Sequence, residues 1–181
     1  MKTLLLAFAL LWVPASAEIL LIDFGSAKDG TDWFIVNDGV MGGLSEGDAV
    51  LQDDALYFAG EVSLENNGGF SSVRSPNGTI DLSDATEMTI RYKTNSYQSA
   101  LTFSVSDQFW IPNYRVTLAA TDGEWTVINV PLRDVKQYRV GTPTGQRLTP
   151  EAQADIIRTG FITNEKRAGM FELTVDYIRF D

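Results

Sequence analysis

The side chains that most often carry out chemistry in proteins are missing from this chain. Its 181 residues include no histidine and no cysteine, which excludes Ser-His-Asp and Cys-His catalytic sites, zinc sites with the usual ligands, iron–sulfur clusters and haem sites of the common kind. The patterns GxGxxG and GxxxxGK[ST] do not occur either, so nothing indicates a nucleotide site. Carboxylate chemistry, lysine chemistry and metal binding through oxygen atoms remain.

Carboxylates are numerous, with 24 Asp and Glu residues in the chain. A glycosidase needs two of them facing each other across a cleft, about 5 to 9.5 Å apart depending on mechanism. Its general acid also needs an apolar neighbourhood that raises its pKa. No pair of acids in the sequence stands out in this way. We therefore expect a protein without hydrolase or redox activity, and the segments suited to binding become the candidates.

The first such segment, NDGVMGGLS, spans residues 37–45 and combines three glycines with short polar side chains. Polar groups beside accessible backbone amides could form a lip that binds hydroxyl or peptide ligands. Alternatively, the segment is an ordered turn in which Asp38 accepts hydrogen bonds from loop amides and Met41 fills a gap in the core. We favour the turn. The candidate binding residues of the lip are Asn37, Asp38, Gly42, Gly43 and Ser45.

Arg74 ends an apolar-rich segment, and an arginine in such a segment is rarely buried without a carboxylate partner. We expect a structural ion pair with Asp38 or Glu61 rather than a ligand contact. The run of Asn and Gly at residues 66–69 lies just before this segment and predicts a hairpin turn.

The segment SDQFWIPNYR, residues 106–115, has the composition best suited to a ligand. Aromatic side chains lie close to amides and charged groups, and sugars and peptides both use flat aromatic faces flanked by amides. The alternative is that Trp110 covers one end of the fold, and both interpretations stay open. The candidate binding residues here are Phe109, Trp110, Tyr114 and Arg115.

Strands must position these residues, because apolar and polar side chains alternate with a period of two along most of the chain. In EMTIRYKT, for example, Met88, Ile90 and Tyr92 alternate with polar residues. The predicted strands are residues 55–65, 87–94, 100–107, 114–120, 124–131 and 170–181. We also expect a first strand at residues 19–24 to pair near a last strand at residues 171–180.

One segment, TPEAQADIIRT, predicts a short helix. Thr149 suits the N-cap, Pro150 the first helical position and Glu151 the helix N-terminus, and Gly160 would end it. One short helix among about ten strands predicts an all-β sandwich. No linker or repeat divides the chain, so we expect one domain over residues 18–181.

The N-terminus has the pattern of a secretory signal peptide. One lysine precedes an apolar run at residues 4–13, and the small residues Ala15, Ser16 and Ala17 follow. The run is too short for a membrane span, which needs roughly 20 apolar residues. We expect residues 1–17 to be removed after Ala17, which places the mature protein in the periplasm or outside the cell.

The chain is strongly acidic. Its formal net charge is −10, and loss of Lys2 with the signal peptide leaves 13 basic and 24 acidic residues, a net charge of −11. Such a chain repels nucleic acid and anionic lipid surfaces. We therefore expect neither of these as a partner.

Two glycine-rich segments identify a family. WFIVNDGVMGGLSEG, residues 33–47, and LYFAGEVSLENNGGFSSVR, residues 56–74, closely resemble the signature of the complex I intermediate-associated protein 30 family. The segments at 123–125, 130–132, 138–156 and 160–180 follow in the family's order. The resemblance implies a jelly-roll β-sandwich of the galactose-binding-domain-like type and non-catalytic work, best known as assembly help for mitochondrial complex I. One departure is KTNSYQSA, residues 93–100, where members often carry a Gly-Asp-Gly-Arg-like turn.

The fold implied by this resemblance raises the possibility of a structural calcium ion. AKDGTDW, residues 27–33, is weakly similar to the calcium-holding loop of many galactose-binding-like domains. Asp29, Thr31 and Asp32 could supply oxygen ligands together with Asp176 or Asp181 from the last strand. Acidic residues are so plentiful that we favour chance clustering as the explanation of the pattern, and we expect no other cofactor.

Two binding functions follow, and a carboxylate enzyme such as a glycosidase is a distant third. We expect an exported accessory module that binds a protein client in the cell envelope, as the resemblance and the missing catalytic residues suggest. The alternative is a carbohydrate-binding module, which the implied fold and the aromatic segment favour.

Overall fold

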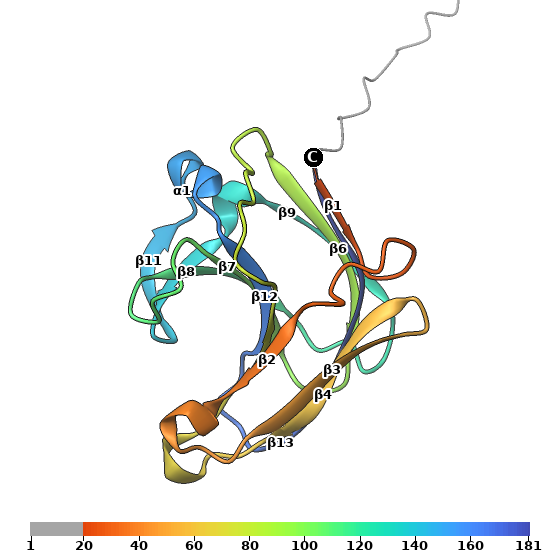
Figure 1. The fold of residues 1–181 in the computed structure, drawn as a ribbon, viewed down its shortest axis with the longest axis vertical. Coiled ribbons are helices and arrows are strands. Elements are labelled where there is room, and N and C mark those ends of the chain that lie inside the picture. Colours follow the sequence, from red (N-terminus) through yellow and green to blue (C-terminus); the bar gives the residue numbers. More distant parts are fainter. Residues whose placement is uncertain (1–19) are drawn as a thin grey trace, which may run out of the picture.

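The computed structural model describes residues 20–181, and the predicted signal peptide lies outside them. No helix within these 162 residues is long and apolar enough to cross a membrane. Two antiparallel sheets pack face to face as a sandwich, which confirms the predicted all-β jelly-roll fold (Figure 1).

The six-stranded sheet is built around the longest strand of the protein. β1 (Leu20–Asp23) and β6 (Glu87–Thr94) both pair with the C-terminal half of β13, and the predicted pairing of the first and last strands is thereby confirmed. The order is β3 (Glu46–Gln52), β4 (Ala55–Val62), β13 (Gly169–Phe180), β6 and β9 (Thr126–Pro131), with β1 added beside β13.

The seven-stranded sheet curves along the left side of Figure 1 from β11 at the upper left to β2 below. Its order is β11 (Thr142–Arg147), β10 (Lys136–Arg139), β8 (Asn113–Leu118), β7 (Ser99–Ser104), β12 (Arg158–Thr163), β5 (Ser71–Arg74) and β2 (Phe34–Asn37). Sequential strands β7 and β8 pair as neighbours, whereas β5 and β12 are brought together from distant parts of the chain.

One hydrophobic core fills the space between the sheets. Aromatic rings dominate it: Phe58 and Phe171 lie 4.8 Å apart between centroids, and Phe103 and Phe180 lie 6.0 Å apart. Each buried aromatic ring removes about 150 to 250 Å² of surface from water. Packing of this kind is what holds a domain that has no disulfide to restrain it.

The six strands predicted from alternation are all present. The missed strands are β2, β3, β5, β10, β11 and β12, and β12 begins within the segment that was predicted to be helical. β11 has six exposed residues, and without a buried face it shows no apolar alternation. β2 and β5 have only four residues each, too few for a period to be recognised.

The predicted helix is real but shorter than expected. α1 covers Pro150–Ala154, and the Thr149 hydroxyl accepts a hydrogen bond from the Ala152 amide at 3.3 Å, as the sequence predicted. The expected end at Gly160 is wrong, because Ile156 already pairs with Ile80 in an isolated β-bridge and Gly160 lies within β12. The two adjacent isoleucines therefore belong to extended chain entering a strand.

The predicted hairpin at residues 66–69 is also wrong. β4 and β5 belong to different sheets, and the segment between them carries the chain across one end of the sandwich through the 3-10 turn η2 (Glu65–Asn67). Asn66 and Asn67 have φ angles of 53° and 60°, which asparagine tolerates better than most residues. The run of Asn and Gly thus forms a turn, as predicted, but one with left-handed residues that crosses between sheets and not a hairpin.

Asp38 ties this crossing to the NDGVMGGLS segment. It begins the 3-10 turn η1 (Asp38–Met41), and its side chain is fully buried. The carboxylate accepts hydrogen bonds from the Ser45 amide at 2.9 Å, the Ser45 hydroxyl at 2.5 Å, the Gly69 amide at 2.6 Å and the Phe70 amide at 3.2 Å. The interpretation of residues 37–45 as an ordered turn around Asp38 is therefore confirmed.

The glycines of this turn have distinct roles. Gly42 has φ +87° with open space around it, so it is needed for backbone conformation alone. Gly43 needs to lack a side chain, because a Cβ there would overlap the Asp38 carboxylate. Met41 does not fill the core as expected, since its side chain is 64% exposed.

Burial and hydrogen bonding act in opposite directions on Asp38. Burial alone would raise the pKa of its carboxyl, but the hydrogen bonds from Ser45, Gly69 and Phe70 outweigh that effect and hold the pKa below the usual 3.8. The charged form is thus the one that the folded state prefers.

We expect Gly42→Ala to lower the free energy of unfolding by about 1 to 2 kcal/mol, the cost of a left-handed conformation for a residue with a Cβ. Gly39→Ala is the matched control, because Gly39 lies in the same turn with open space and no positive φ. Both changes restrict the unfolded chain equally, so the difference between their urea denaturation midpoints measures the strain. Equal midpoints would contradict the assignment.

Asp38→Asn should lower the free energy of unfolding at pH 7 by about 2 to 3 kcal/mol, because an amide nitrogen then faces buried donors. Since folding lowers the pKa of Asp38, its contribution is complete above pH 3.8 and is lost as the pH falls through its folded-state value. The stability difference between wild type and variant should therefore shrink below that pH. Asp84→Asn, which changes an exposed carboxylate, should show neither effect.

Candidate functional site: the outer face of the seven-stranded sheet

The outer face of the seven-stranded sheet follows from what its strands bury. Val73 of β5, Phe161 of β12 and Phe103 of β7 are fully buried in the core. Successive side chains of a strand point to opposite faces, so the residues next to these point away from the core. Arg74 and Gly160 are thereby placed on the outer face.

Strand register aligns several of these residues in one row. Arg74 lies opposite Gly160, which lies opposite Thr102, and Thr102 lies opposite Arg115. The row continues at both ends, with Phe34 of β2 beside Arg74 and Lys136 of β10 beside Arg115. Gly160 of β12 and Thr102 of β7 are small, so the sheet surface is shallow between the long side chains of Arg74 and Arg115.

The next row adds a third arginine. Arg158 lies opposite Ser104, which lies opposite Asn113, and Asn113 lies opposite Tyr138. We refer to Arg74, Arg115 and Arg158, with the small residues Gly160, Thr102 and Ser104 between them, as the arginine face. It combines cations, hydroxyls and an amide on a surface that no other element of residues 20–181 is paired against.

The three arginines have few partners. Arg74 Nε donates to Ser72 Oγ at 3.1 Å, and Arg115 donates to Asn113 Oδ1 at 3.1 Å. Arg158 Nε is buried and has no hydrogen-bond partner. The ion pairs found between residues 20 and 181 involve other arginines. The predicted pairing of Arg74 with Asp38 or Glu61 is therefore wrong, because loop amides already occupy Asp38 and Glu61 lies in the other sheet.

Aromatic rings support two of these guanidinium groups. Arg115 lies over Tyr138 with 5.0 Å between its Cζ atom and the ring centroid, and Arg158 lies over Phe34 at 5.4 Å. Such contacts are worth about 0.5 to 1 kcal/mol at exposed sites. They also hold the planar groups roughly in place, so that their unused N–H donors remain available.

The positive charges on this face disfavour one another. Burial lowers the pKa of Arg74, and the charges of Arg158 and Arg115 lower it further. Burial likewise lowers the pKa of Arg115. Arginine nonetheless remains protonated at any physiological pH, so the face carries its full charge.

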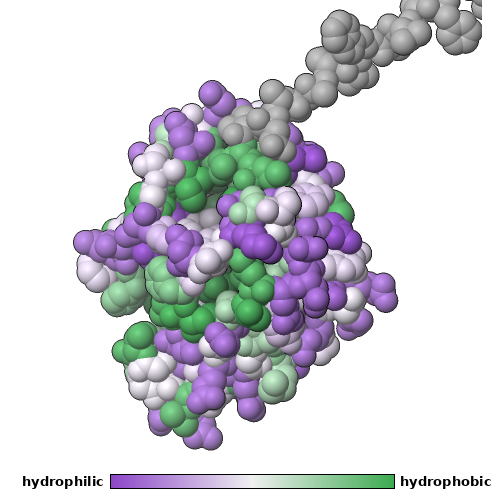
Figure 2. Space-filling model, turned by 45° about the vertical axis from the view of Figure 1, so that its right-hand side comes forward, coloured by the Kyte–Doolittle hydropathy of each residue, from purple (hydrophilic) through white to green (hydrophobic). Residues whose placement is uncertain are grey.

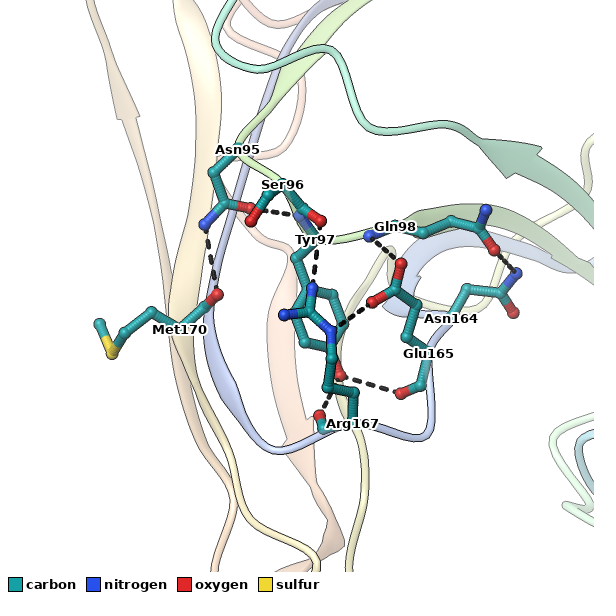
Figure 3. Close-up of polar contacts among 8 residues, drawn as sticks. All are labelled: Asn95, Ser96, Tyr97, Gln98, Asn164, Glu165, Arg167 and Met170. Atoms are coloured by element: carbon teal, nitrogen blue, oxygen red, sulfur yellow. Dashed lines mark hydrogen bonds and ion pairs between the residues drawn. The ribbon is translucent and has the colours of Figure 1, made fainter.

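A polar network extends from Arg115 through Asn164 to the neighbouring loops, and Figure 3 shows its part around Asn164, Gln98 and Glu165. Arg115 Nη1 lies 3.5 Å from Asn164 Oδ1, and Asn164 donates to Gln98 Oε1 at 3.3 Å. Glu165 then accepts from the Gln98 amide at 3.2 Å and from Arg167 Nε at 2.8 Å. The network joins the β6–β7 loop to the β12–β13 loop, so the departure from the family pattern at residues 93–100 has a structural role here.

The Tyr97 side chain anchors the β6–β7 and β12–β13 loops from the core side. Its ring is fully buried, and its hydroxyl lies 2.6 Å from the Arg167 carbonyl oxygen and 2.9 Å from that of Glu165. Arg167 also lies over the ring, with 4.7 Å to its centroid. The loop geometry beside the arginine face is thus fixed by a core residue.

The predicted aromatic segment divides between the surface and the core. Phe109 and Trp110 are 72% and 48% exposed and form an edge-to-face pair at 5.2 Å in the loop between β7 and β8. Arg139 Nε donates to the Trp110 carbonyl oxygen at 3.2 Å, which holds this loop near β10. Tyr114 is only 6% exposed, so its proposed ligand contact is wrong: β8 directs it inward, and Gln137 donates to its hydroxyl.

The candidate calcium ligands do not converge. Asp29 accepts a hydrogen bond from the Asp23 amide, Thr31 donates to the Lys28 carbonyl oxygen, and Asp176 pairs with Arg91. Within residues 20–181 no group of three or more acidic side chains could hold a metal ion. These residues therefore do not fit a calcium site.

Asp29, Thr31 and Asp32 line a groove between β1 and the loop after β5 instead. Figure 2, which turns the right-hand side of Figure 1 forward, shows apolar areas on either side of a polar band on this side of the molecule. The segment after β1 thus serves as a polar covering at the open edge of the sandwich.

The outer face of the six-stranded sheet offers a second aromatic surface. Trp125 is 39% exposed, but Arg91 lies 4.2 Å and Lys93 5.0 Å from its ring centroid. Glu172 and Tyr57 line the same groove, and the negative charge of Glu172 adds to burial in raising the pKa of Tyr57. Of the two cations, Arg91 is paired with Asp176 of the same sheet.

The arginine face was only partly predictable. Arg74 and Arg115 were among the candidates, whereas Arg158, Phe34 and Tyr138 were not. Their strands are short or carry no clear alternation, and only the cross-strand register brings them together. Of the residues proposed as a lip, Asp38 and Ser45 are buried and serve the turn.

Several solved structures share this fold. A family 11 carbohydrate-binding module of the cellulosomal cellulase Lic26A-Cel5E of Clostridium thermocellum matches with a TM-score of 0.65 and 14% identity, covering 92% of this chain and 95% of that chain. The family 11 module of the same organism in complex with a β-1,3-1,4-mixed-linked tetrasaccharide matches with a TM-score of 0.61 and 12% identity, covering 92% and 96%. At these identities the likeness shows the fold alone.

An agarase, AgWH50C, matches with a TM-score of 0.58 and 12% identity, but 91% of this chain covers only 24% of that enzyme. No curated protein sequence matches this chain. The sequence model of one family, complex I intermediate-associated protein 30, matches residues 22–175. This match spans most of the chain, which therefore belongs to the complex I intermediate-associated protein 30 (CIA30) family.

Proposed function

We propose that this domain binds a polysaccharide along the arginine face. The observation that carries the proposal is the row of small residues, Gly160 and Thr102, between long planar side chains on an open sheet surface. A sugar chain needs such a surface, with hydroxyl and amide partners and flat groups to lie against. Ser104, Asn113 and Tyr138 supply these in the adjacent row.

The fold supports the same function. Carbohydrate-binding modules of Clostridium thermocellum share it over nearly their whole length, and one of them was solved with a bound tetrasaccharide. Fold alone does not fix function, so the argument depends on the groups that this chain itself presents.

The proposed action is binding without catalysis. Glycoside hydrolysis requires two carboxyl groups beside the sugar, and the strands that form the arginine face contain no Asp or Glu. The agarase also contains a part with this fold, but that part makes up only 24% of the enzyme. The family membership and the fold together indicate a non-catalytic binding domain.

A protein client in the cell envelope is the second candidate. The specific observation in its favour is the η1 turn, where Val40, Met41 and Leu44 are 76%, 64% and 54% exposed. Apolar side chains grouped on a surface loop suit contact with another protein. This surface lies at the lower left of Figure 1, at one end of the sandwich.

We also propose that the chain is exported, on the strength of the apolar run and small residues before Glu18. Expression of the full-length protein in a bacterium should yield a periplasmic product whose N-terminal sequence begins at Glu18. A chain lacking residues 2–17 is the control and should stay in the cytoplasm. A cytoplasmic full-length product with an intact N-terminus would contradict export.

Trp110→Ala should weaken binding of the best ligand from a panel of soluble polysaccharides by about tenfold, measured by isothermal titration calorimetry, because one exposed aromatic contact beside the face is lost. Trp125→Ala is the matched control: it removes an exposed tryptophan from the opposite sheet and should leave affinity unchanged. The thermal midpoint of Trp110→Ala should stay near that of wild type.

The opposite pattern, with affinity lost only in Trp125→Ala, would move the site to the six-stranded sheet. Failure of the whole panel, together with capture of one defined envelope protein that Met41→Ser abolishes, would favour the protein client. The two candidates are thus separated by different surfaces of the same domain.

A further inference from the structure

Charge is divided unevenly between the two sheets. The strands of the seven-stranded sheet contain six basic residues and no acidic one; the basic residues are Arg74, Arg115, Lys136, Arg139, Arg147 and Arg158. The strands of the six-stranded sheet contain seven acidic residues and three basic ones. Although the net charge of the chain is −10, all the charged residues in the strands of the seven-stranded sheet are basic.

The charges of the arginine face lack counterions. Four other arginines in the described part of the chain form ion pairs with acidic side chains, among them Arg147 with Asp134 and Arg167 with Glu165. Arg74, Arg115 and Arg158 take part in no ion pair, and Arg158 Nε is a buried donor without an acceptor. A buried donor left unsatisfied costs free energy, as does like-charge repulsion, so grouping these three charges has a cost to the fold.

A bound anion would supply what the domain lacks. Guanidinium groups match carboxylate and sulfate oxygens with paired N–H donors, and such charge-assisted hydrogen bonds are about twice as strong as neutral ones. The aromatic supports under Arg115 and Arg158 leave the edges of both groups free to donate. The overall negative charge does not prevent this, because exposed charges are screened beyond about 8 Å at physiological ionic strength.

We propose that the ligand of the arginine face is an acidic polysaccharide, one whose sugar units carry carboxylate or sulfate groups. This inference rests on the proposed function and narrows it to a ligand class. The spacing is suitable: Arg74 and Arg115 lie three strands apart in one row, which is about 14 Å of sheet. A chain of acidic sugars lying across the strands can therefore meet both cations, with Arg158 offset to one side.

The ligand test compares polymers that differ only in charge. Polyuronate and its carboxyl-reduced form make one pair, and a sulfated galactan and its desulfated form make the other. Calorimetry should show binding to at least one acidic member and at least tenfold weaker binding to its neutral partner. The two pairs distinguish carboxylate from sulfate, and affinity should fall as salt is raised from about 20 mM to about 500 mM.

Variants then locate the charge dependence. Arg158→Gln should weaken binding of the acidic polymer by about tenfold, and Arg74→Gln by a similar factor, while Arg158→Lys should retain more of it. Lys93→Gln is the matched control, because it removes one positive charge from the outer face of the opposite sheet. Neutral Gln at position 158 also relieves repulsion, so its thermal midpoint should equal or exceed that of wild type.

The outcomes separate this inference from the proposed function. Equal affinity for charged and neutral polymers, unaffected by Arg158→Gln, would leave polysaccharide binding standing and overturn the acidic ligand. Equally tight binding of a single-stranded oligonucleotide would also overturn it, since the face would then bind any polyanion. Absence of binding across all four polymers would reject polysaccharide binding itself.

Discussion

The alternation of side chains along the strands of the seven-stranded sheet governs both the core and the site. Val73, Phe103 and Phe161 must be buried to cover the opposite sheet, and this fixes which of their neighbours face outward. A shift of one residue in β12 would bury Arg158 and expose Phe161, and a shift in β5 would bury Arg74 and expose Val73. The hydrophobic core therefore determines the register, and the register places the arginines of three strands on one face of the sheet.

Buried polar groups secure the ends of this arrangement. The Asp38 carboxylate accepts hydrogen bonds from amides of a loop about 30 residues later in the chain. Tyr97, Glu165 and Arg167 connect a second pair of loops in a similar way. The Asp38 carboxylate and the Tyr97 hydroxyl both have hydrogen-bond partners, as is usual for buried polar groups. Within the described residues, only Arg158 Nε and Ser99 Oγ are buried side-chain polar atoms without a hydrogen-bond partner, and such exceptions call for an explanation.

Family and fold point in different directions for function. The CIA30 family is named for association with a complex I intermediate, whereas the solved structures that share the fold include carbohydrate-binding modules. The two candidate ligands correspond to two different surfaces. The apolar η1 turn suits the proposed protein client, and the polar arginine face suits the proposed acidic polysaccharide. Because these surfaces are separate, one domain has room for both without either compromising the other.

The sequence by itself determined the fold class, most of the longer strands and the family, because alternation and glycine spacing are local properties. It favoured an ordered turn around Asp38, but it also offered Asp38 as a partner of Arg74, and the structure decided between these roles. What it could not supply was which strands pair. Arg74, Arg115 and Arg158 are up to 84 residues apart and meet only through β5, β12, β7 and β8. Tyr114 and Met41 were misplaced for a related reason: whether a side chain is buried depends on the facing sheet, and no local pattern records that contact.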